Sequence, residues 1–245
     1  MEDNSGKIYR LNPLLEGLKS SSERINKIYI QRDKKSRKIS QIIHSAKTKN
    51  IPLFFVPKQK LDRLSSEHQG VVALVAAKAY VPFSSLLAAS PNPFLVLLDG
   101  LEDPQNLGAI LRSAEGAGVD GVILPERGSV RLTEAVAAVS AGAVEHVRVA
   151  RVKNLARAMD ALKKEDLWLV GAEGGRSEFW YEFDYRLPLA LVFGSEGKGL
   201  RPLIKKKCDK ILSIPLLGKI SSLNVAAAAA IFFYEVVRQR LKNKR

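Results

Sequence analysis

The spacing of apolar positions divides the front of the chain into short strands and helices. Short apolar runs predict strands over residues 27–30, 51–56 and 70–77, and helical spacing predicts an amphipathic helix over 39–46. Leu61 and Leu64 form a short apolar segment between the last two of these strands. Asn12 with Pro13 has the pattern of an N-cap followed by a first helical residue. The pattern therefore predicts a compact α/β module that ends near residue 80.

Beyond that module, strand and helix patterns alternate to the end of the chain. Apolar runs predict strands at 94–98, 119–124, 147–150, 167–170, 189–193 and 211–214, and helices are expected over 106–117, 155–162 and 225–238. This alternation is typical of an α/β fold with a mostly parallel sheet covered by helices on both faces. Ser, Pro and Asn are frequent in 84–93, as in linkers. We therefore expect two domains, 1–80 and 93–245, joined by a linker over 81–92.

Composition and charge limit the class of molecule that the protein is expected to bind. The 245 residues are 46% hydrophobic and 26% charged, as in an ordinary globular protein, but the formal net charge is +14. Half of that excess falls in the first fifty residues, which hold twelve Lys and Arg against five Asp and Glu. Such an excess of cations attracts a polyanion, so nucleic acid or an anionic membrane surface is the expected partner.

Membrane insertion and secretion are not indicated. The most apolar run, Val225 to Tyr234, is too short to span a bilayer, and Met1 to Arg10 lacks the apolar segment of a secretory signal. The single cysteine, Cys208, allows no internal disulfide and no structural zinc site. The expectation is a cytoplasmic protein without a membrane partner, with attachment to an anionic surface as the minor alternative.

A first polar motif follows the strand predicted over 94–98. It consists of the run Asp103 to Gly108, which includes Asn106, and continues to Arg112. Ligands of open α/β sheets bind beyond the carboxyl ends of strands, which is where this loop lies. Asn106 and Arg112 are six residues apart on the expected helix, so they occupy related but different faces. The alternative is that Asp103 or Asn106 caps the helix and Arg112 is a solvated charge.

Two more motifs also follow predicted strands. Phe193 to Gly199 holds three glycines in six residues, so its backbone can turn sharply against a ligand, although its spacing is not that of a phosphate loop. Ile214 to Gly218 and then Ser221 to Val225 lead into the last helix. An ordinary strand-to-helix turn and a helix cap at Ser222 or Asn224 are the alternatives. Together, three such motifs at strand ends favour one shared site.

In order and spacing, the three motifs resemble those of the SpoU (TrmH-type) branch of the SPOUT methyltransferases, over nearly all of residues 94–240. The front resembles the substrate-binding domain of the ribosomal-RNA guanosine 2′-O-methyltransferases in this branch, through Asn12 to Glu16 and His68 to Val71. That domain is similar to ribosomal protein L30e. Leu216 stands where the family commonly has Met and Ala226 where it commonly has Ser, and neither change removes a group that the chemistry needs.

The resemblance implies a trefoil knot, a homodimer, RNA as substrate and S-adenosylmethionine as cofactor. The substrate implied is a guanosine of 23S ribosomal RNA, with transfer RNA as the alternative. The implied cofactor-binding residues are Gly194, Ile214, Leu216, Leu223 and Asn224. The implied catalytic residues are Asn106, Arg112, Glu196, Ser222 and Asn224.

The implied reaction asks mainly for positioning, because the sulfonium leaving group is already activated. The resemblance makes Arg112 the group that activates the 2′-hydroxyl. A guanidinium is a poor base, so we expect Arg112 to stabilise the developing alkoxide and to hold a phosphate, with proton abstraction as the alternative. Glu196 is expected to hold Arg112 or another nearby group. His44, His68 and His146 are not spaced as metal ligands, so no catalytic metal is expected.

Two other function classes explain less of the sequence. A non-catalytic RNA-binding protein would account for the basic front but not for three motifs at strand ends. A nucleotide-dependent oxidoreductase would account for the sheet and the glycine-rich turns, but no glycine fingerprint follows the first strand of either predicted domain. Methyl transfer to RNA is therefore the function that the sequence favours.

Overall fold

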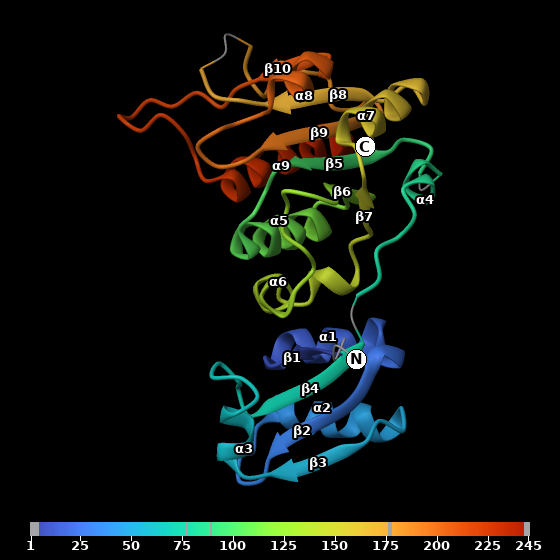
Figure 1. Cartoon of the computed structure of the whole chain (residues 1–245), viewed down its shortest axis with the longest axis vertical. Coiled ribbons are helices and arrows are strands. Elements are labelled where there is room, and N and C mark those ends of the chain that lie inside the picture. Colours follow the sequence, from blue (N-terminus) through green and yellow to red (C-terminus); the bar gives the residue numbers. More distant parts are fainter. Residues whose placement is uncertain (1–4, 77, 89, 176–177, 243–245) are drawn as a thin grey trace. The chain divides into compact units, whose positions relative to one another are not determined.

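The computed structural model describes residues 5–76, 78–88, 90–175 and 178–242. These residues form two compact units, which are described separately below (Figure 1). The first unit consists of residues 1–79 together with 131–146, and the second consists of 80–130 together with 147–245. The sequence predicted domains at 1–80 and 93–245 that would fold independently. The division into compact units does not test this, so it stays a prediction.

A four-stranded sheet forms the centre of the first unit. The strands are ordered β1-β4-β2-β3, with β2 and β3 parallel and the other pairs antiparallel. Their bounds are β1 Ser5–Ile8, β2 Ile25–Gln31, β3 Leu53–Val56 and β4 Val71–Ala76. The helices are α1 Leu11–Ser20, a 3-10 turn η1 Ser22–Arg24, α2 Arg37–Thr48 and α3 Lys58–Asp62. The α/β module expected from the sequence is confirmed, although Ala77, at the end of the predicted third strand, lies outside the described residues.

The start of α1 differs from the prediction. The helix begins at Leu11 rather than at Pro13, and its N-cap is Arg10, whose side chain makes no capping bond. The amide of Leu11 instead donates to Oε1 of Gln69 at 3.1 Å, while Oδ1 of Asn12 accepts from Nζ of Lys38 at 2.7 Å. The predicted cap at Asn12 is therefore wrong, because a side chain distant in sequence satisfies the first turn.

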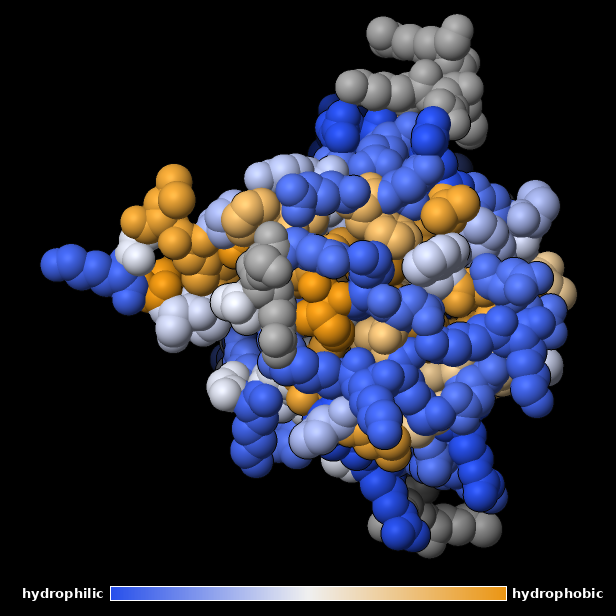
Figure 2. Space-filling model, turned by 90° about the horizontal axis from the view of Figure 1, so that it is seen from above, coloured by the Kyte–Doolittle hydropathy of each residue, from blue (hydrophilic) through white to orange (hydrophobic). Residues whose placement is uncertain are grey.

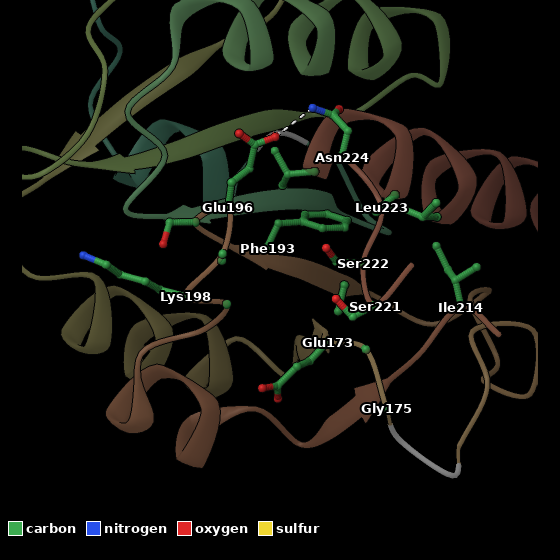
Figure 3. Close-up of a pocket in the computed structure, with 18 of the residues that line it drawn as sticks. Glu173, Gly175, Phe193, Glu196, Lys198, Ile214, Ser221, Ser222, Leu223 and Asn224 are labelled. Atoms are coloured by element: carbon green, nitrogen blue, oxygen red, sulfur yellow. Dashed lines mark hydrogen bonds between the residues drawn. The ribbon is translucent and has the colours of Figure 1, made fainter. Parts of the chain in front are cut away.

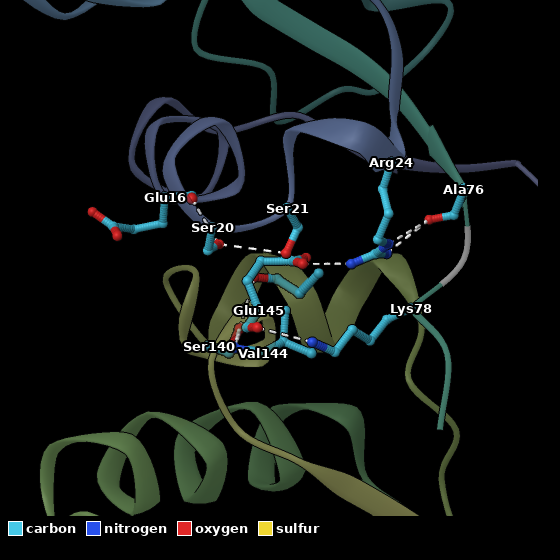
Figure 4. Close-up of polar contacts among 10 residues, drawn as sticks. Glu16, Ser20, Ser21, Arg24, Ala76, Lys78, Ser140, Val144 and Glu145 are labelled. Carbon is cyan, nitrogen blue, oxygen red and sulfur yellow. Dashed lines mark hydrogen bonds and ion pairs between the residues drawn. The ribbon is translucent and has the colours of Figure 1, made fainter. Parts of the chain in front are cut away.

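Residues 131–146 belong to the first unit although they lie far from it in sequence. They contain α6 Glu134–Val139 and a 3-10 turn η2 Ala143–Glu145. The buried carboxylate of Glu145 forms an ion pair with Arg24, whose Nη2 also donates to the carbonyl of Ala76 at 2.7 Å (Figure 4). Nζ of Lys78 donates to the backbone carbonyl of Glu145 at 2.8 Å, and burial lowers the pKa of Lys78. The ion pair of Arg24 with Glu145 and the hydrogen bond from Lys78 thus help to hold this segment against the front of the chain.

The second unit is built on a six-stranded sheet in which every pair is parallel. The strand order is β10-β8-β9-β5-β6-β7. The bounds are β5 Phe94–Asp99, β6 Gly121–Pro125, β7 Val149–Val152, β8 Trp168–Ala172, β9 Leu189–Gly194 and β10 Lys210–Leu212. Each of the six predicted apolar runs coincides with one of these strands. The prediction of a parallel α/β sheet is confirmed.

Helices cover both faces of this sheet. Leu95 and Leu97 of β5 pack with residues of α4, α7 and α8, whereas Phe94, on the opposite face, packs edge-to-face against Phe233 of α9. The helices are α4 Ser84–Leu87, α5 Pro104–Gly116, α7 Leu155–Lys164, α8 Pro202–Lys207 and α9 Val225–Lys242. Leu86 of α4, within the segment predicted as a linker, is fully buried in this core. Because both faces are closed, ligands can reach this sheet only at its edges and ends.

Helix α9 buries part of its apolar side within the second unit. Phe232 and Val236 are each 1% exposed, and the ring of Phe232 packs edge-to-face on Phe193 of β9. Phe233 packs in the same way on Phe94 of β5, so the sheet itself covers these rings. The large apolar side chains that α9 does expose are Tyr234 and Leu241.

A loop between β10 and α9 carries exposed apolar side chains. Leu217 is fully exposed and Ile220 is 64% exposed. In the space-filling view, an orange projection stands out on the left, on the side where this loop lies in Figure 1 (Figure 2). No helix in the described part of the chain is long and apolar enough to cross a membrane.

Candidate active site

A cavity of about 650 Å³ opens at the carboxyl ends of β8, β9 and β10. Its walls come from the segments that follow these three strands and from the first turns of α9 (Figure 3). The residues around it are Ala172 to Gly175, Phe193 to Gly199, Leu212, Ile214, Leu216, Ser221 to Val225, Ala228 and Phe232. The second and third sequence motifs therefore meet at one site, at the end of the sheet where α/β proteins bind ligands.

The backbone of the segment that follows β9 requires glycine at several positions. A Cβ on Gly194 would lie 2.1 Å from the carbonyl carbon of Gly199, so only glycine fits where the loop returns to the strand end. The return is closed by the amide of Gly199, which donates to the carbonyl of Ser195 at 2.9 Å. Gly197 and Gly199 have φ of +76° and +65°, in the left-handed region that favours glycine. The backbone at these glycines therefore forms part of this wall, beside the side chains of Ser195, Glu196 and Lys198.

Asn224 joins the three motifs. Its Nδ2 donates to Oδ1 of Asn106 at 2.8 Å and to Oε1 of Glu196 at 2.7 Å. Its Oδ1 accepts from the amides of Ala226 and Ala227 at 2.9 and 3.2 Å, at the start of α9. The side chain thus caps α9, as one interpretation of the sequence expected, and it also ties α5 to the loop after β9.

A smaller cavity of about 240 Å³ shares Ser195, Glu196 and Lys198 with the larger one. Its other walls are Gly100 to Asp103 and Asn106, from the segment that follows β5 and the first turn of α5. Figure 3 shows Glu196 and Asn224 meeting at one end of the larger cavity, with Glu173 and Gly175 at the opposite end. Glu196 therefore stands between a large pocket and a small polar one.

Among the predicted site residues, Arg112 is the one that does not lie at either cavity. It is exposed on α5 and lines neither cavity. The carboxylate of Glu196, expected to hold Arg112 or another nearby group, accepts a hydrogen bond from Asn224. Asn106, Glu196, Ser222, Leu223 and Asn224 surround the two cavities, as do the predicted cofactor-binding residues Gly194, Ile214 and Leu216.

The segment after β8 also belongs to the site, although no sequence motif pointed to it. Glu173, Gly174 and Gly175 line the larger cavity, and the Glu173 carboxylate pairs with Nζ of Lys205 at 2.7 Å. The signal was present, because these residues directly follow a predicted strand, as the recognised motifs do. The rule that ligands bind at strand ends would have found them.

Two further groups near the strand ends have structural explanations. Asp99, 1% exposed at the end of β5, accepts from the amide of Arg201 at 2.9 Å and from its Nε at 2.7 Å. A buried carboxylate needs such partners, and this pair fixes the start of α8 to β5. Burial raises the pKa of the Cys208 thiol to about 12, so this thiol stays protonated and is a poor nucleophile.

Comparison with protein families gives two matches. Residues 93–234 match the model of the family described as the SpoU rRNA Methylase family. The matched range includes all three motifs. Residues 8–81 match a family described as RNA 2′-O ribose methyltransferase substrate binding. The two matches do not overlap, since one ends at residue 81 and the other begins at residue 93.

Individual proteins give the same result. A Bacillus subtilis protein, whose name places it in the TrmH family of tRNA/rRNA methyltransferases, is 42% identical over 234 residues, which cover 94% of each chain. A solved structure titled RNA 2′-O ribose methyltransferase has a TM-score of 0.81 at 27% identity, covering 97% of this chain and 90% of the other. The SpoU methyltransferase AviRb from Streptomyces viridochromogenes, in complex with the cofactor AdoMet, has a TM-score of 0.83 at 24% identity, covering 97% and 91%, and shows the shared fold.

Proposed function

The chain belongs to the SpoU rRNA Methylase family, and we propose that it transfers the methyl group of S-adenosylmethionine to a ribose 2′-hydroxyl of RNA. It is an RNA methyltransferase of the TrmH/SpoU type, a family that uses S-adenosylmethionine. The observation that carries the proposal is the cavity at the strand ends, where Asn224 joins the three motifs of the chain.

The residues around the larger cavity fit the cofactor. Its volume of about 650 Å³ suits a ligand with a nucleoside at one end and an amino acid at the other. Ile214, Leu216 and Leu223 provide apolar side chains, and the wall at Gly194 leaves no room for a Cβ. When bound, the cofactor supplies an activated methyl group. The protein then has to hold the ribose oxygen in line with that group.

The smaller cavity is the place that we propose for the ribose. Asn106, Ser195 and Glu196 present polar groups there that can orient a hydroxyl. Asn224 keeps Asn106 and Glu196 at fixed separation through its two donated hydrogen bonds. Proton transfer from the hydroxyl is eased by a cation close to the developing alkoxide, the role that we propose for Arg112.

Arg112 can take this role only if something brings it to a cavity. It lies one helical turn before Gly116 on α5, and the hydroxyl of Tyr234 is 3.2 Å from where a Cβ of Gly116 would lie. A second copy of the chain that covers the exposed ring of Tyr234 would therefore also reach Arg112. We propose a homodimer through this face, in which Arg112 of one chain serves the cavities of the other.

The substrate that we propose is a guanosine of 23S ribosomal RNA. Residues 1–80 act as the RNA-binding domain, 81–92 as the linker and 93–245 as the catalytic domain with the family's knot. Transfer RNA is the second candidate, because the names of the relatives include both RNAs. The basic front of the chain and the match of residues 8–81 to a substrate-binding family support an RNA rather than a small substrate.

Methyl transfer by the purified protein tests the proposal. The full chain is incubated with methyl-labelled S-adenosylmethionine and unmodified 23S ribosomal RNA or transfer RNA, and the RNA is digested to nucleosides. The expected product is a 2′-O-methylated guanosine from the ribosomal RNA. Label on a base, or none on either RNA although the protein is folded, would contradict the proposal.

A further inference from the structure

Along β2 and β3, helices cover one face of the sheet of the first unit, and most of the opposite face is open. Ile28 and Ile30 of β2 pack into a core with α1 and α2, which lie behind the sheet in Figure 1. Side chains alternate along a strand, so Tyr29 and its register partner Phe54 on β3 belong to the opposite face. Among the described residues, the short α3 and its neighbours cover one end of that face, through the small cluster of Val56, Leu61 and Val72.

Two aromatic rings lie side by side on this open face. The centroids of Tyr29 and Phe54 are 5.6 Å apart with a tilt of 40°. Tyr29 is half-buried against the small cluster, and Phe54 is 46% exposed. Phe54 is distinguished from the equally exposed Phe55 by its place, because it lies beside a second aromatic ring on the face that carries the lysines. Its free surface suits a flat partner.

Lysines surround the pair of rings. Nζ of Lys27 is 5.7 Å and Nζ of Lys60 is 5.3 Å from the centroid of Tyr29. Lys7 joins them on the same face, because Lys7 and Lys27 are both register partners of Leu74. Among the described residues none of these three lysines forms an ion pair, so their charges are available to a ligand.

We propose that Tyr29 and Phe54 form a stacking surface for unpaired bases of the RNA, with Lys7, Lys27 and Lys60 holding the neighbouring phosphates. The proposal rests on the proposed function only for its premise that the substrate is RNA. Single strands are bound in this way, by aromatic rings that stack on bases within a basic surface. A base-paired duplex hides the faces of its bases, so the surface selects an unpaired segment of the RNA.

A protein partner is the other occupant that an aromatic surface can have. Three lysines without acidic partners would have to be desolvated or matched by carboxylates in such an interface, and a second copy of this chain would bring the same positive charges opposite them. RNA supplies the matching negative charge without further requirement. The observations therefore favour RNA, and a protein interface becomes an outcome of the test.

The test measures RNA affinity of the full chain. A fluorescein-labelled 12-nucleotide oligoadenylate serves as single-stranded probe, and a duplex of the same length serves for comparison. Phe54→Ala is expected to weaken binding of the single strand about tenfold and to leave duplex binding unchanged. Phe55→Ala is the matched control, because Phe55 is 48% exposed at the next position of β3 and faces the other side. It should change neither affinity more than twofold.

The lysines are tested through salt dependence. In the double variant Lys27→Gln with Lys60→Gln, the slope of log affinity for the oligoadenylate against log salt should fall by about 1.4, or roughly 0.7 for each lost phosphate contact. Removing the exposed charges Lys47 and Lys164, which lie on α2 and α7, should flatten the slope much less.

Cross-linking locates the contact without a substitution. An oligonucleotide containing 5-iodouridine should attach on irradiation within Ile25–Gln31 or Leu53–Val56. Equal affinity of Phe54→Ala and wild type, cross-links confined to other segments, or a fall in the particle mass of Phe54→Ala would overturn the proposal. Wild-type methyl transfer would be intact in those cases, whereas failure of the proposed function would appear as absence of transfer by the wild-type chain itself.

Discussion

The two sheets of this protein differ in where a ligand can reach them. One is accessible at its strand ends and the other on one of its faces. Helices close both faces of the six-stranded sheet, so its ligand site lies at the strand ends, where loop backbone and a few polar side chains form the walls. The four-stranded sheet is closed by α1 and α2 on one face, and its other face presents the side chains of Tyr29 and Phe54 with lysines around them. A site at strand ends suits a small cofactor held in one pose. An open face suits a long, flexible polyanion.

Arg112→Ala gives the largest expected effect and tests whether catalysis needs a group outside the cavities. We expect the rate of methyl transfer to fall about 1000-fold, the scale of losing an electrostatic stabiliser of the transition state. Calorimetry should find affinity for S-adenosylmethionine unchanged within a few-fold, because Arg112 does not line the larger cavity. Arg157→Ala, at an exposed position on α7, is the control and should retain full activity. Normal turnover of Arg112→Ala would make Arg112 a surface charge.

Gly194→Ala tests whether backbone forms the wall of the cofactor cavity. The added Cβ would meet the backbone of Gly199 at 2.1 Å, so the loop must move, and affinity for S-adenosylmethionine should fall about 100-fold. Gly197→Ala is the matched control in the same loop. No atom lies within 4 Å of its Cβ, and only the left-handed backbone opposes it, at about 1 kcal/mol. Calorimetry that finds equal losses for both variants would contradict the close approach at Gly194.

Glu145→Gln tests whether residues 131–146 belong to the first unit. Loss of the buried partner of Arg24 should lower the free energy of unfolding of that unit by about 2 kcal/mol. Urea unfolding is followed by circular dichroism, which reports both units, and by tryptophan fluorescence, because Trp168 and Trp180 both lie in the second unit.

Only the transition seen by circular dichroism should move to lower urea. Glu178→Gln, which removes an exposed pair with Lys210, is the control and should cost less than about 0.5 kcal/mol. A fluorescence transition that moves as far as the dichroism transition would assign the segment to the second unit.

Tyr234→Glu tests the proposed dimer, and its direct readout is a twofold change in mass. Light scattering of the wild-type chain at micromolar concentration should give twice 27.0 kDa, and the variant should approach 27.0 kDa and lose activity. Leu203→Glu is the control, since Leu203 is 59% exposed on α8, which covers the other face of the sheet. An active wild-type monomer would show that one chain completes the site.

The sequence predicted the second unit better than the first for a physical reason. Strands buried on both faces are continuous apolar runs, and all six were found. In the first unit, β1 was missed because Ser5–Ile8 is a short, polar edge strand. The start of α1 was misplaced because Gln69 satisfies it from 58 positions away. No local pattern shows that Glu145 pairs with Arg24, since the two are 121 positions apart.

The same contrast holds for the site. Gly194, Asn224 and Ile214 were found because they follow strands, and the cavity gathers them. The sequence predicted the last helix but not the surface that covers it, which Phe193 of β9 provides for Phe232 and Phe94 of β5 for Phe233. Sequence motifs identify strand-end chemistry, whereas the partners of helix faces depend on the assembled fold.

Mapping of ribose methylation on total RNA from cells with and without this protein is the decisive test of the proposed activity. We expect that one 2′-O-methylated guanosine of 23S ribosomal RNA disappears without the protein, returns with the wild-type chain and does not return with Arg112→Ala. An unchanged pattern of 2′-O-methylation in both ribosomal and transfer RNA would contradict it.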